Sequence, residues 1–168
     1  MINITLPNGD VRQYPEGASG MDIAKSISDG LARMAVGIYV NNKPYDLTRP
    51  ITMDATIRIV TFDNDEGKEI FWHSTAHLMA EALESMYPGV KFGIGPPIEA
   101  GFYYDVDLPG DVKLSVADLP KIEAKMMELV KRDVPYERVE MTWGDAVAYF
   151  SEKGDEYKLE LLDGLKDS

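Results

Sequence analysis

The chain contains only two histidines, His73 and His77, and they lie four residues apart. The residues around them have helical periodicity, so both imidazoles are expected to project from the same side of one helix. Imidazole changes charge near neutral pH, so such a pair can position or activate a water molecule, or bind a metal ion. The same spacing also fits two partly exposed histidines on an ordinary helix surface, and the spacing alone does not separate these interpretations.

A zinc site is the first alternative to test against this spacing. The zinc-protease motif has two histidines at the same separation, but it requires a glutamate directly after the first one as general base. Here that residue is Ser74. A zinc site also needs a third protein ligand, and no Asp or Glu is singled out by its spacing. We therefore predict no metal site in this chain.

A loop rich in glycine and proline, FGIGPP at residues 92–97, follows the histidine segment. It is not a phosphate-binding P-loop, because no Gly-Lys-Ser/Thr follows and Pro96 and Pro97 lack the backbone donors that such a loop uses. We interpret it as a rigid connection that fixes the following residues. Among these, Tyr104 and Asp105 are candidates for lining a pocket, and alternation along a strand at 102–107 places them on opposite sides.

Lys158 is the remaining candidate for chemistry. It lies in a segment, residues 157–162, that we predict to be the final strand of the chain. A lysine in a strand is usually a solvated edge residue. If it lined a pocket instead, its compact ammonium group would hold a carbonyl or phosphate oxygen.

Several further elements must position these residues. The histidine helix is predicted at 68–87, where Pro88-Gly89 ends it, and a second amphipathic helix lies around Leu119–Val130. A strand is expected at 136–141, and a short helix capped by Thr142 is expected to end near Gly154. This second region is therefore predicted to be α+β.

The first sixty residues predict a different module. A hairpin is expected at 2–6 and 11–14, a strand at 36–42 with a tight turn at Asn41-Asn42, and a strand at 56–61. Ser19 and Asp22 form a capping box that starts a helix, which Gly30 is expected to end. One helix across a small mixed sheet buries both apolar faces. The polar stretch 63–67 separates the two regions, which gives predicted domains at 1–62 and 63–168.

Composition narrows the possible functions. The chain has no cysteine, which excludes disulfides and thiolate chemistry within it and suits a reducing cytoplasm. No stretch approaches the roughly 20 apolar residues of a membrane helix. Residues 1–62 are electrically neutral, so residues 63–168 carry the entire net charge of −12. An acidic second region argues against tight nucleic-acid binding by this chain alone, since phosphate contacts need basic side chains.

The motifs together resemble one family. H-x-x-x-H at 73–77, G-I-G-P-P-I at 93–98, G-F-Y-Y-D at 101–105 and E-Y-K-L at 156–159 are similar to those of bacterial threonyl-tRNA synthetases. The first 62 residues resemble the TGS domain, a ubiquitin-like β-grasp module. Residues 63–168 resemble the start of the editing domain of these enzymes.

The resemblance implies a function for the parent enzyme and roles for the candidate residues. The parent ligates threonine to its tRNA with ATP, and the editing domain hydrolyses tRNA that wrongly carries serine. His73 and His77 would together position or activate the hydrolytic water and contact the terminal adenosine. The resemblance does not assign either role to one of the two histidines. Lys158 would assist in the pocket, Tyr104 would form a wall, and Asp105 is its neighbouring candidate for substrate binding.

The resemblance also implies what lies outside this sequence. The family completes the pocket with a later C-x-x-G-x-H segment that is absent here, so we expect a fragment that is inactive by itself. No cofactor is expected in the fragment, and ATP, Mg²⁺ and Zn²⁺ belong to the catalytic domain of the full enzyme. The implied partner is the 3′ aminoacyl-adenosine end of threonine tRNA, with no membrane partner, and the full enzyme is expected to be a homodimer through other domains.

Two other classes of protein stay open from the residues alone. A non-catalytic β-grasp regulatory or interaction protein would use its acidic second half as a partner surface. A free-standing trans-editing hydrolase would need the missing Cys/His segment for activity.

Overall fold

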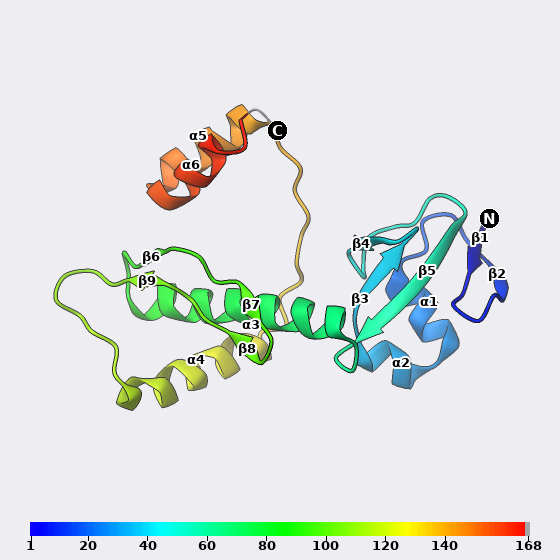
Figure 1. Cartoon of the computed structure of the whole chain (residues 1–168), viewed down its shortest axis with the longest axis horizontal. Coiled ribbons are helices and arrows are strands. Elements are labelled where there is room, and N and C mark those ends of the chain that lie inside the picture. Colours follow the sequence, from blue (N-terminus) through cyan, green and yellow to red (C-terminus); the bar gives the residue numbers. More distant parts are fainter. Residues whose placement is uncertain (167–168) are drawn as a thin grey trace. The chain divides into compact units, whose positions relative to one another are not determined.

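A computed structural model describes residues 1–166, and its internal contacts divide the chain into two compact units. The first unit is Met1–Ser74 and the second begins at Thr75, so the division falls inside one long helix. Figure 1 shows the helices and strands of both units in the order of the sequence. Among the described residues, no helix combines the length and apolar character that crossing a bilayer requires.

The first unit is built on a mixed five-stranded sheet in the order β2-β1-β5-β3-β4. The neighbours β1 and β5 are parallel, and all other neighbouring strands are antiparallel. The hairpin and the two later strands predicted from the sequence are confirmed, and β4 is an additional short edge strand. The strands are β1 Ile2–Thr5, β2 Val11–Tyr14, β3 Ala35–Val40, β4 Lys43–Tyr45 and β5 Ala55–Thr61.

Turn chemistry explains the β3–β4 hairpin. Asn41 and Asn42 both have positive φ, 50° and 63°, as a two-residue hairpin turn of the primed type requires. The side chain of Asn41 also accepts a hydrogen bond from the amide of Thr56 at 2.9 Å, which ties the turn to β5. The tight turn expected at these two asparagines is therefore confirmed.

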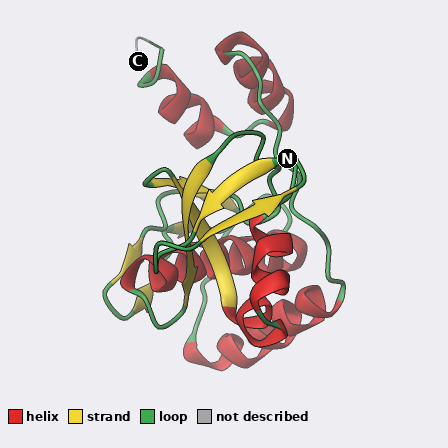
Figure 2. Cartoon of the chain, turned by 90° about the vertical axis from the view of Figure 1, so that its right-hand side faces the viewer, coloured by secondary structure: helices red, strands yellow, loops and turns green. Residues whose placement is uncertain are grey.

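Helix α1 (Gly20–Ile27) packs on one face of this sheet, and the short helix α2 (Asp29–Met34) follows it (Figure 2). The predicted capping box is present, because the hydroxyl of Ser19 accepts from the amide of Asp22 and the Asp22 carboxylate accepts from the amide of Ser19. The helix ends at Ser28 rather than Gly30, since Ser28 caps the start of α2. The core between helix and sheet consists mainly of isoleucines: Ile2, Ile4, Ile23, Ile38, Ile51 and Ile57. The predicted β-grasp arrangement is confirmed.

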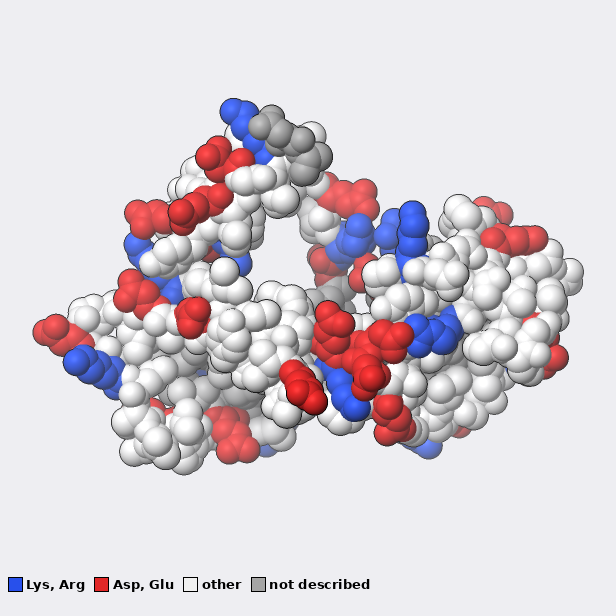
Figure 3. Space-filling model, viewed as in Figure 1, with Lys and Arg blue, Asp and Glu red and all other residues white. Residues whose placement is uncertain are grey.

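The long helix α3 spans Asp65–Met86, close to the predicted 68–87. It begins earlier because the backbone carbonyl of Asn64 accepts from the amide of Lys68 at 2.9 Å. The turn before α3 and its first turns carry four carboxylates, and Figure 3 shows acidic side chains gathered there. They are Asp63, Asp65, Glu66 and Glu69. Such a surface disfavours phosphate binding at this end of the helix.

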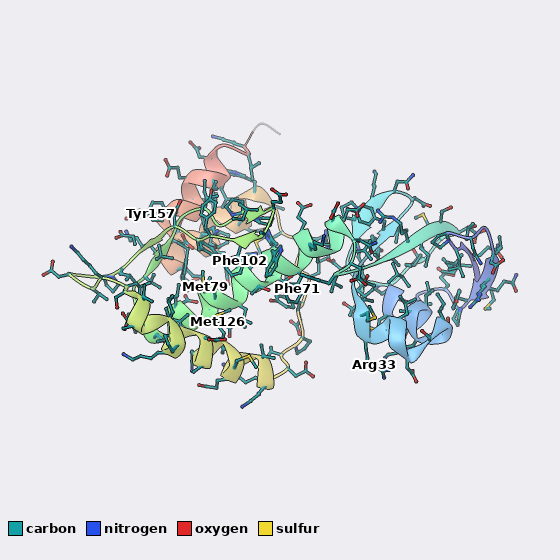
Figure 4. The ribbon with its side chains drawn as sticks, turned by 60° about the horizontal axis from the view of Figure 1, so that its bottom comes forward. Arg33, Phe71, Met79, Phe102, Met126 and Tyr157 are labelled. Atoms are coloured by element: carbon teal, nitrogen blue, oxygen red, sulfur yellow. The ribbon has the colours of Figure 1, made fainter. Side chains whose placement is uncertain are left out.

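The second unit combines the rest of α3 with two short antiparallel ribbons and a second amphipathic helix, α4 (Leu119–Lys131). The ribbons pair β6 Lys91–Phe92 with β9 Val106–Asp107, and β7 Pro97–Ile98 with β8 Gly101–Phe102. A 3₁₀ turn, Val116–Asp118, precedes α4. Helices α3 and α4 run side by side, with Met79 on α3 and Met126 on α4 (Figures 1 and 4). The predicted α+β composition is confirmed.

Two further helices follow, α5 (Trp143–Lys153) and α6 (Glu156–Asp163). The predicted caps of α5 are present: Thr142 accepts from the amide of Asp145, and Gly154 follows the helix with a φ of 67°. The two helices lie side by side, and the indole nitrogen of Trp143 donates to the carbonyl of Leu162 at 2.8 Å. Buried side chains of the second unit are Ala76, Ala82, Leu83, Ile122, Leu129 and Ala146.

Three strand predictions in the second unit are wrong or partly wrong. Residues 157–162 form helix α6, because Asp155 caps it and the segment consists of good helix formers. Residues 136–141 belong to no strand, since within the described residues they have no neighbouring strand to satisfy their backbone groups. The strand expected at 102–107 is split, with Tyr103–Asp105 between β8 and β9.

Candidate functional site

Both histidines lie on α3, one helical turn apart, and both side chains are exposed. No proline interrupts the helix between its start and Met86, and the only glycine in it is near its beginning. The apolar side of this segment is occupied by Ala76 and Leu83, which are buried. Each histidine therefore lies on an exposed part of α3, four residues from the other.

Tyr104 lies in the connection between β8 and β9, where its ring is half-buried. The β6–β9 pairing continues beyond the strands, because the amide of Gly93 donates to the carbonyl of Asp105 at 2.9 Å and the amide of Asp105 donates to the carbonyl of Ile94 at 3.0 Å. This backbone pairing fixes the ring. Phe92 contacts it edge to face, with ring centroids 5.5 Å apart.

The phenol of Tyr104 is harder to ionise than a free tyrosine. Burial raises its pKa, and the negative charge of Asp155 adds to the effect. Tyr104 therefore stays neutral at physiological pH and can serve as a hydrogen-bond donor or an apolar wall. Its neighbour Asp105 has an exposed side chain, while its backbone makes the two hydrogen bonds that extend the ribbon.

Lys158 is half-buried on α6, not on a strand. Its amide donates to the carboxylate of Asp155 at 3.1 Å, so Asp155 caps this helix while its charge acts on Tyr104. Asp155 thus links the start of α6 electrostatically to Tyr104.

An ion pair also joins α6 to the ribbon. The ammonium of Lys91 on β6 contacts the carboxylate of Glu156 at 2.6 Å. This hydrogen bond raises the pKa of Lys91 and lowers that of Glu156. Lys91 and Asp155 were not among the predicted site residues. The sequence Gly154-Asp155-Glu156 contains the signal that was missed, since a helix-ending glycine followed by an N-capping aspartate marks a new helix.

Within residues 1–166, no group of three or more histidine, aspartate or glutamate side chains is arranged to hold a metal ion.

A family model described as the TGS domain matches residues 2–61, which are the five-stranded sheet with α1 and α2. The first module is a TGS domain. Helix α3, the ribbons and α4–α6 follow the TGS domain and lie outside the matched range.

The chain is similar along its length to enzymes named threonine–tRNA ligase. It is 54% identical to the one from Cytophaga hutchinsonii and 50% identical to the one from Parabacteroides distasonis, each over 99% of this chain and 26% of the relative. The enzyme of Chloroherpeton thalassium is 49% identical over the whole chain and 26% of its own length. The chain thus spans about a quarter of the length of these relatives.

Proposed function

We propose that this chain is the N-terminal region of a threonine–tRNA ligase and carries part of a site that hydrolyses tRNA mischarged with serine. The observation that carries this proposal is the pair His73 and His77, exposed one turn apart on α3, in a chain that is similar to threonine–tRNA ligases along its length. We assign residues 1–62 to the TGS domain and residues 63–168 to the first part of the hydrolytic domain.

Hydrolysis of mischarged tRNA is needed because a binding pocket discriminates poorly between threonine and serine. Threonine and serine differ by one methyl group, and one such group provides only about 1–3 kcal/mol of discrimination in a binding pocket. A ligase that joins threonine to tRNA with ATP will therefore also attach serine at times. A second site that is too small for threonine can remove the error by cleaving the ester.

The chemistry requires a water molecule, a proton acceptor and a positive charge. The water oxygen attacks the ester carbonyl, an imidazole of His73 or His77 takes the water proton, and the tRNA ribose oxygen leaves and is protonated. Lys158 supplies a compact positive charge for the carbonyl or a phosphate oxygen. Tyr104, neutral and held against Phe92, forms a wall. Asp105 is a further candidate for substrate contact through its exposed carboxylate.

The remaining functions of the parent ligase are assigned to the portion that this chain does not span. ATP, Mg²⁺ and Zn²⁺ would bind there, and so would the second subunit of a cytoplasmic homodimer. The partner of the present region is the aminoacylated 3′ adenosine of threonine tRNA. Because the region is acidic, we propose that other parts of the ligase supply most of the phosphate contacts.

The test is deacylation of seryl-tRNA by the full-length ligase. His73→Ala and His77→Ala should each lower the rate by about 10²-fold or more, the usual contribution of acid–base catalysis. Ser74→Ala is the matched control, since Ser74 is exposed on the same helix, and it should leave the rate unchanged. Full activity in the double histidine variant would exclude the proposed site.

The completeness of the site is tested separately. This chain should not deacylate seryl-tRNA, whereas a version extended through the following segment of the ligase should. Equal, His73-dependent activity in both would show that the pocket is composed of other residues.

A further inference from the structure

The first turns of α3 lie directly against the sheet of the TGS domain. Gly67, in the first turn, is so close to the carbonyl oxygen of Thr61 at the end of β5 that no β-carbon fits between them. A β-carbon there would also lie 3.3 Å from Cγ2 of Val36 on β3. The helix backbone therefore touches the strand backbone, and no side-chain rearrangement can make room for a larger residue.

A second close approach follows almost one turn later. Ile70 of α3 covers Gly37 of β3, where a β-carbon would lie 2.7 Å from Cδ1 of Ile70 and 3.4 Å from Cγ2 of Val60. Val60 is fully buried, although the α1 helix covers the other face of the sheet. A glycine inside a strand weakens the strand and commonly marks a close approach by another element. Here that element is α3.

Polar contacts fix the same junction. Thr61 and Asn64 bond each other twice: the amide of Thr61 donates to the Asn64 side chain at 2.9 Å, and the amide of Asn64 donates to the Thr61 carbonyl at 3.0 Å. Arg58 of β5 donates to Glu66 of α3 at 2.7 Å and holds the pKa of this carboxyl below its ordinary value. The Arg58 guanidinium also lies 4.7 Å from the centre of the Tyr39 ring, which restricts its position.

We propose that the TGS domain positions His73 through this junction, with Gly67 as the decisive positioning residue. His73 follows Gly67 on the same helix within two turns, over which an α-helix is stiff. The contact between Gly67 and Thr61 sets the distance of α3 from the sheet. The contact between Ile70 and Gly37 sets the rotation of α3 about its axis. The ion pair of Arg58 and Glu66 holds the first turn of α3 in place. This gives the TGS domain a structural role in the hydrolytic site. The consequence for catalysis rests on the proposed function, whereas the junction itself can be tested without it.

The variant Gly67→Ala should disturb the contact between α3 and the sheet without disturbing the helix itself. Alanine favours a helix over glycine, so α3 itself should persist, while the added methyl group forces the helix away from Thr61. Gly30→Ala is the matched control, because it also places an alanine in a helix, but there the new β-carbon would lie 3.8 Å from the Ser28 hydroxyl, an ordinary contact distance. Ile70→Ala is a milder second variant that needs no backbone shift.

The readout in this chain is NMR of the two imidazoles, which are its only histidine signals, together with amide hydrogen exchange of the first turns of α3. Gly67→Ala should shift the His73 signal and speed exchange there with unchanged helical content, and Ile70→Ala should do the same to a smaller extent. Gly30→Ala should do neither. An unchanged His73 signal and unchanged exchange in Gly67→Ala would overturn the proposal, and if that variant fails to fold, the same result in Ile70→Ala would overturn it.

The catalytic consequence is measured in the full-length ligase. Displacing a catalytic group by about 1 Å can cost about 10²-fold, so Gly67→Ala should lower kcat for seryl-tRNA deacylation by up to that factor. KM and the rate of threonine ligation should stay near their original values. If the histidine variants keep full deacylation, the proposed function fails but a shifted His73 signal still supports the junction. If the histidine variants are inactive and Gly67→Ala deacylates normally, the positioning role fails alone.

Discussion

The ring of Tyr104 occupies the space that a side chain at Gly95 would need. A β-carbon at Gly95 would lie 2.7 Å from Cδ2 and 2.8 Å from both Cγ and Cε2 of the tyrosine. The glycine of the G-I-G-P segment is therefore required by the position of the ring. The loop and the tyrosine form one packed unit, in which the smallest residue at 95 allows the aromatic side chain to reach the backbone.

The first prediction follows from this contact. Gly95→Ala should push the Tyr104 ring toward water and lower its pKa from the raised value toward the ordinary one of about 10. In the original chain, the raised pKa means that the neutral phenol stabilises the fold fully below about pH 10, and this contribution is lost as the pH rises through the raised pKa. A spectrophotometric titration, with Tyr104→Phe subtracted to identify the signal, measures the change. A pKa that is the same in Gly95→Ala and in the original chain would contradict the packing argument.

The second prediction separates two effects of Asp155. Asp155→Ala removes the cap of α6 and should destabilise that helix by about 1 kcal/mol, whereas Asp155→Asn keeps a good cap and should not. Both variants remove the negative charge and should lower the pKa of Tyr104. Amide exchange in α6 reports the first effect and the tyrosine titration reports the second. Equal exchange in the alanine and asparagine variants would show that the cap does not stabilise α6.

The third prediction concerns the capping box of α1. The Ser19 hydroxyl donates to the Asp22 carboxylate at 2.6 Å, and this bond, more than the amide bond from Ser19, lowers the pKa of Asp22. The resulting stability is present above the ordinary aspartate pKa of about 3.9 and is lost as the pH falls through the lowered value. Ser19→Ala should therefore cost about 1 kcal/mol at neutral pH and less in acid.

Urea titrations followed by NMR signals of α1 measure this difference at pH 7 and in acid. The matched control is Asp22→Asn, which removes the titrating group and should abolish the pH dependence of the difference. A cost of Ser19→Ala that is the same at both pH values would contradict the assignment of Asp22 as the responsible group.

The fourth prediction concerns Lys158. Lys158→Met keeps the length of the side chain and its helix propensity but removes the charge, and it should lower kcat for seryl-tRNA deacylation in the full-length ligase by about 10²-fold, as is typical for loss of a transition-state donor. Lys121→Met is the control, because Lys121 is an exposed lysine on α4 that pairs only weakly with Asp118, at 3.5 Å. An effect on KM alone would assign Lys158 to tRNA binding rather than to the reaction.

The sequence predicted the elements whose signals are local. The Ser19–Asp22 box, the Asn41-Asn42 turn and the Thr142 cap were read correctly, because each depends on hydrogen bonds or φ values within a few residues. The β-grasp arrangement followed from the order of these elements. The histidine pair was identified for the same reason, since its spacing fixes its relation on any helix.

The wrong predictions arose where alternation of apolar and polar residues was interpreted as a strand paired in a sheet. Residues 157–162 alternate like a strand, but a capping aspartate and helix-forming side chains decide the local structure, and α6 results. Residues 136–141 have the composition of a strand, yet a strand exists only when a neighbour accepts its backbone hydrogen bonds. The periodicity of six residues shows neither whether a capping residue starts a helix nor whether a neighbouring strand is present.

The sequence by itself determined that two imidazoles lie one turn apart on a long helix, that the N-terminal module has a β-grasp order, and that the chain has no thiol chemistry. Only the tertiary structure decided which surfaces meet: Gly67 against Thr61, Ile70 over Gly37, Tyr104 over Gly95, and Lys91 with Glu156. The physical reason is that helix and turn preferences act within a few residues, whereas close contacts depend on how distant segments pack. A glycine looks the same in the sequence whether it ends a helix or makes room for a neighbour.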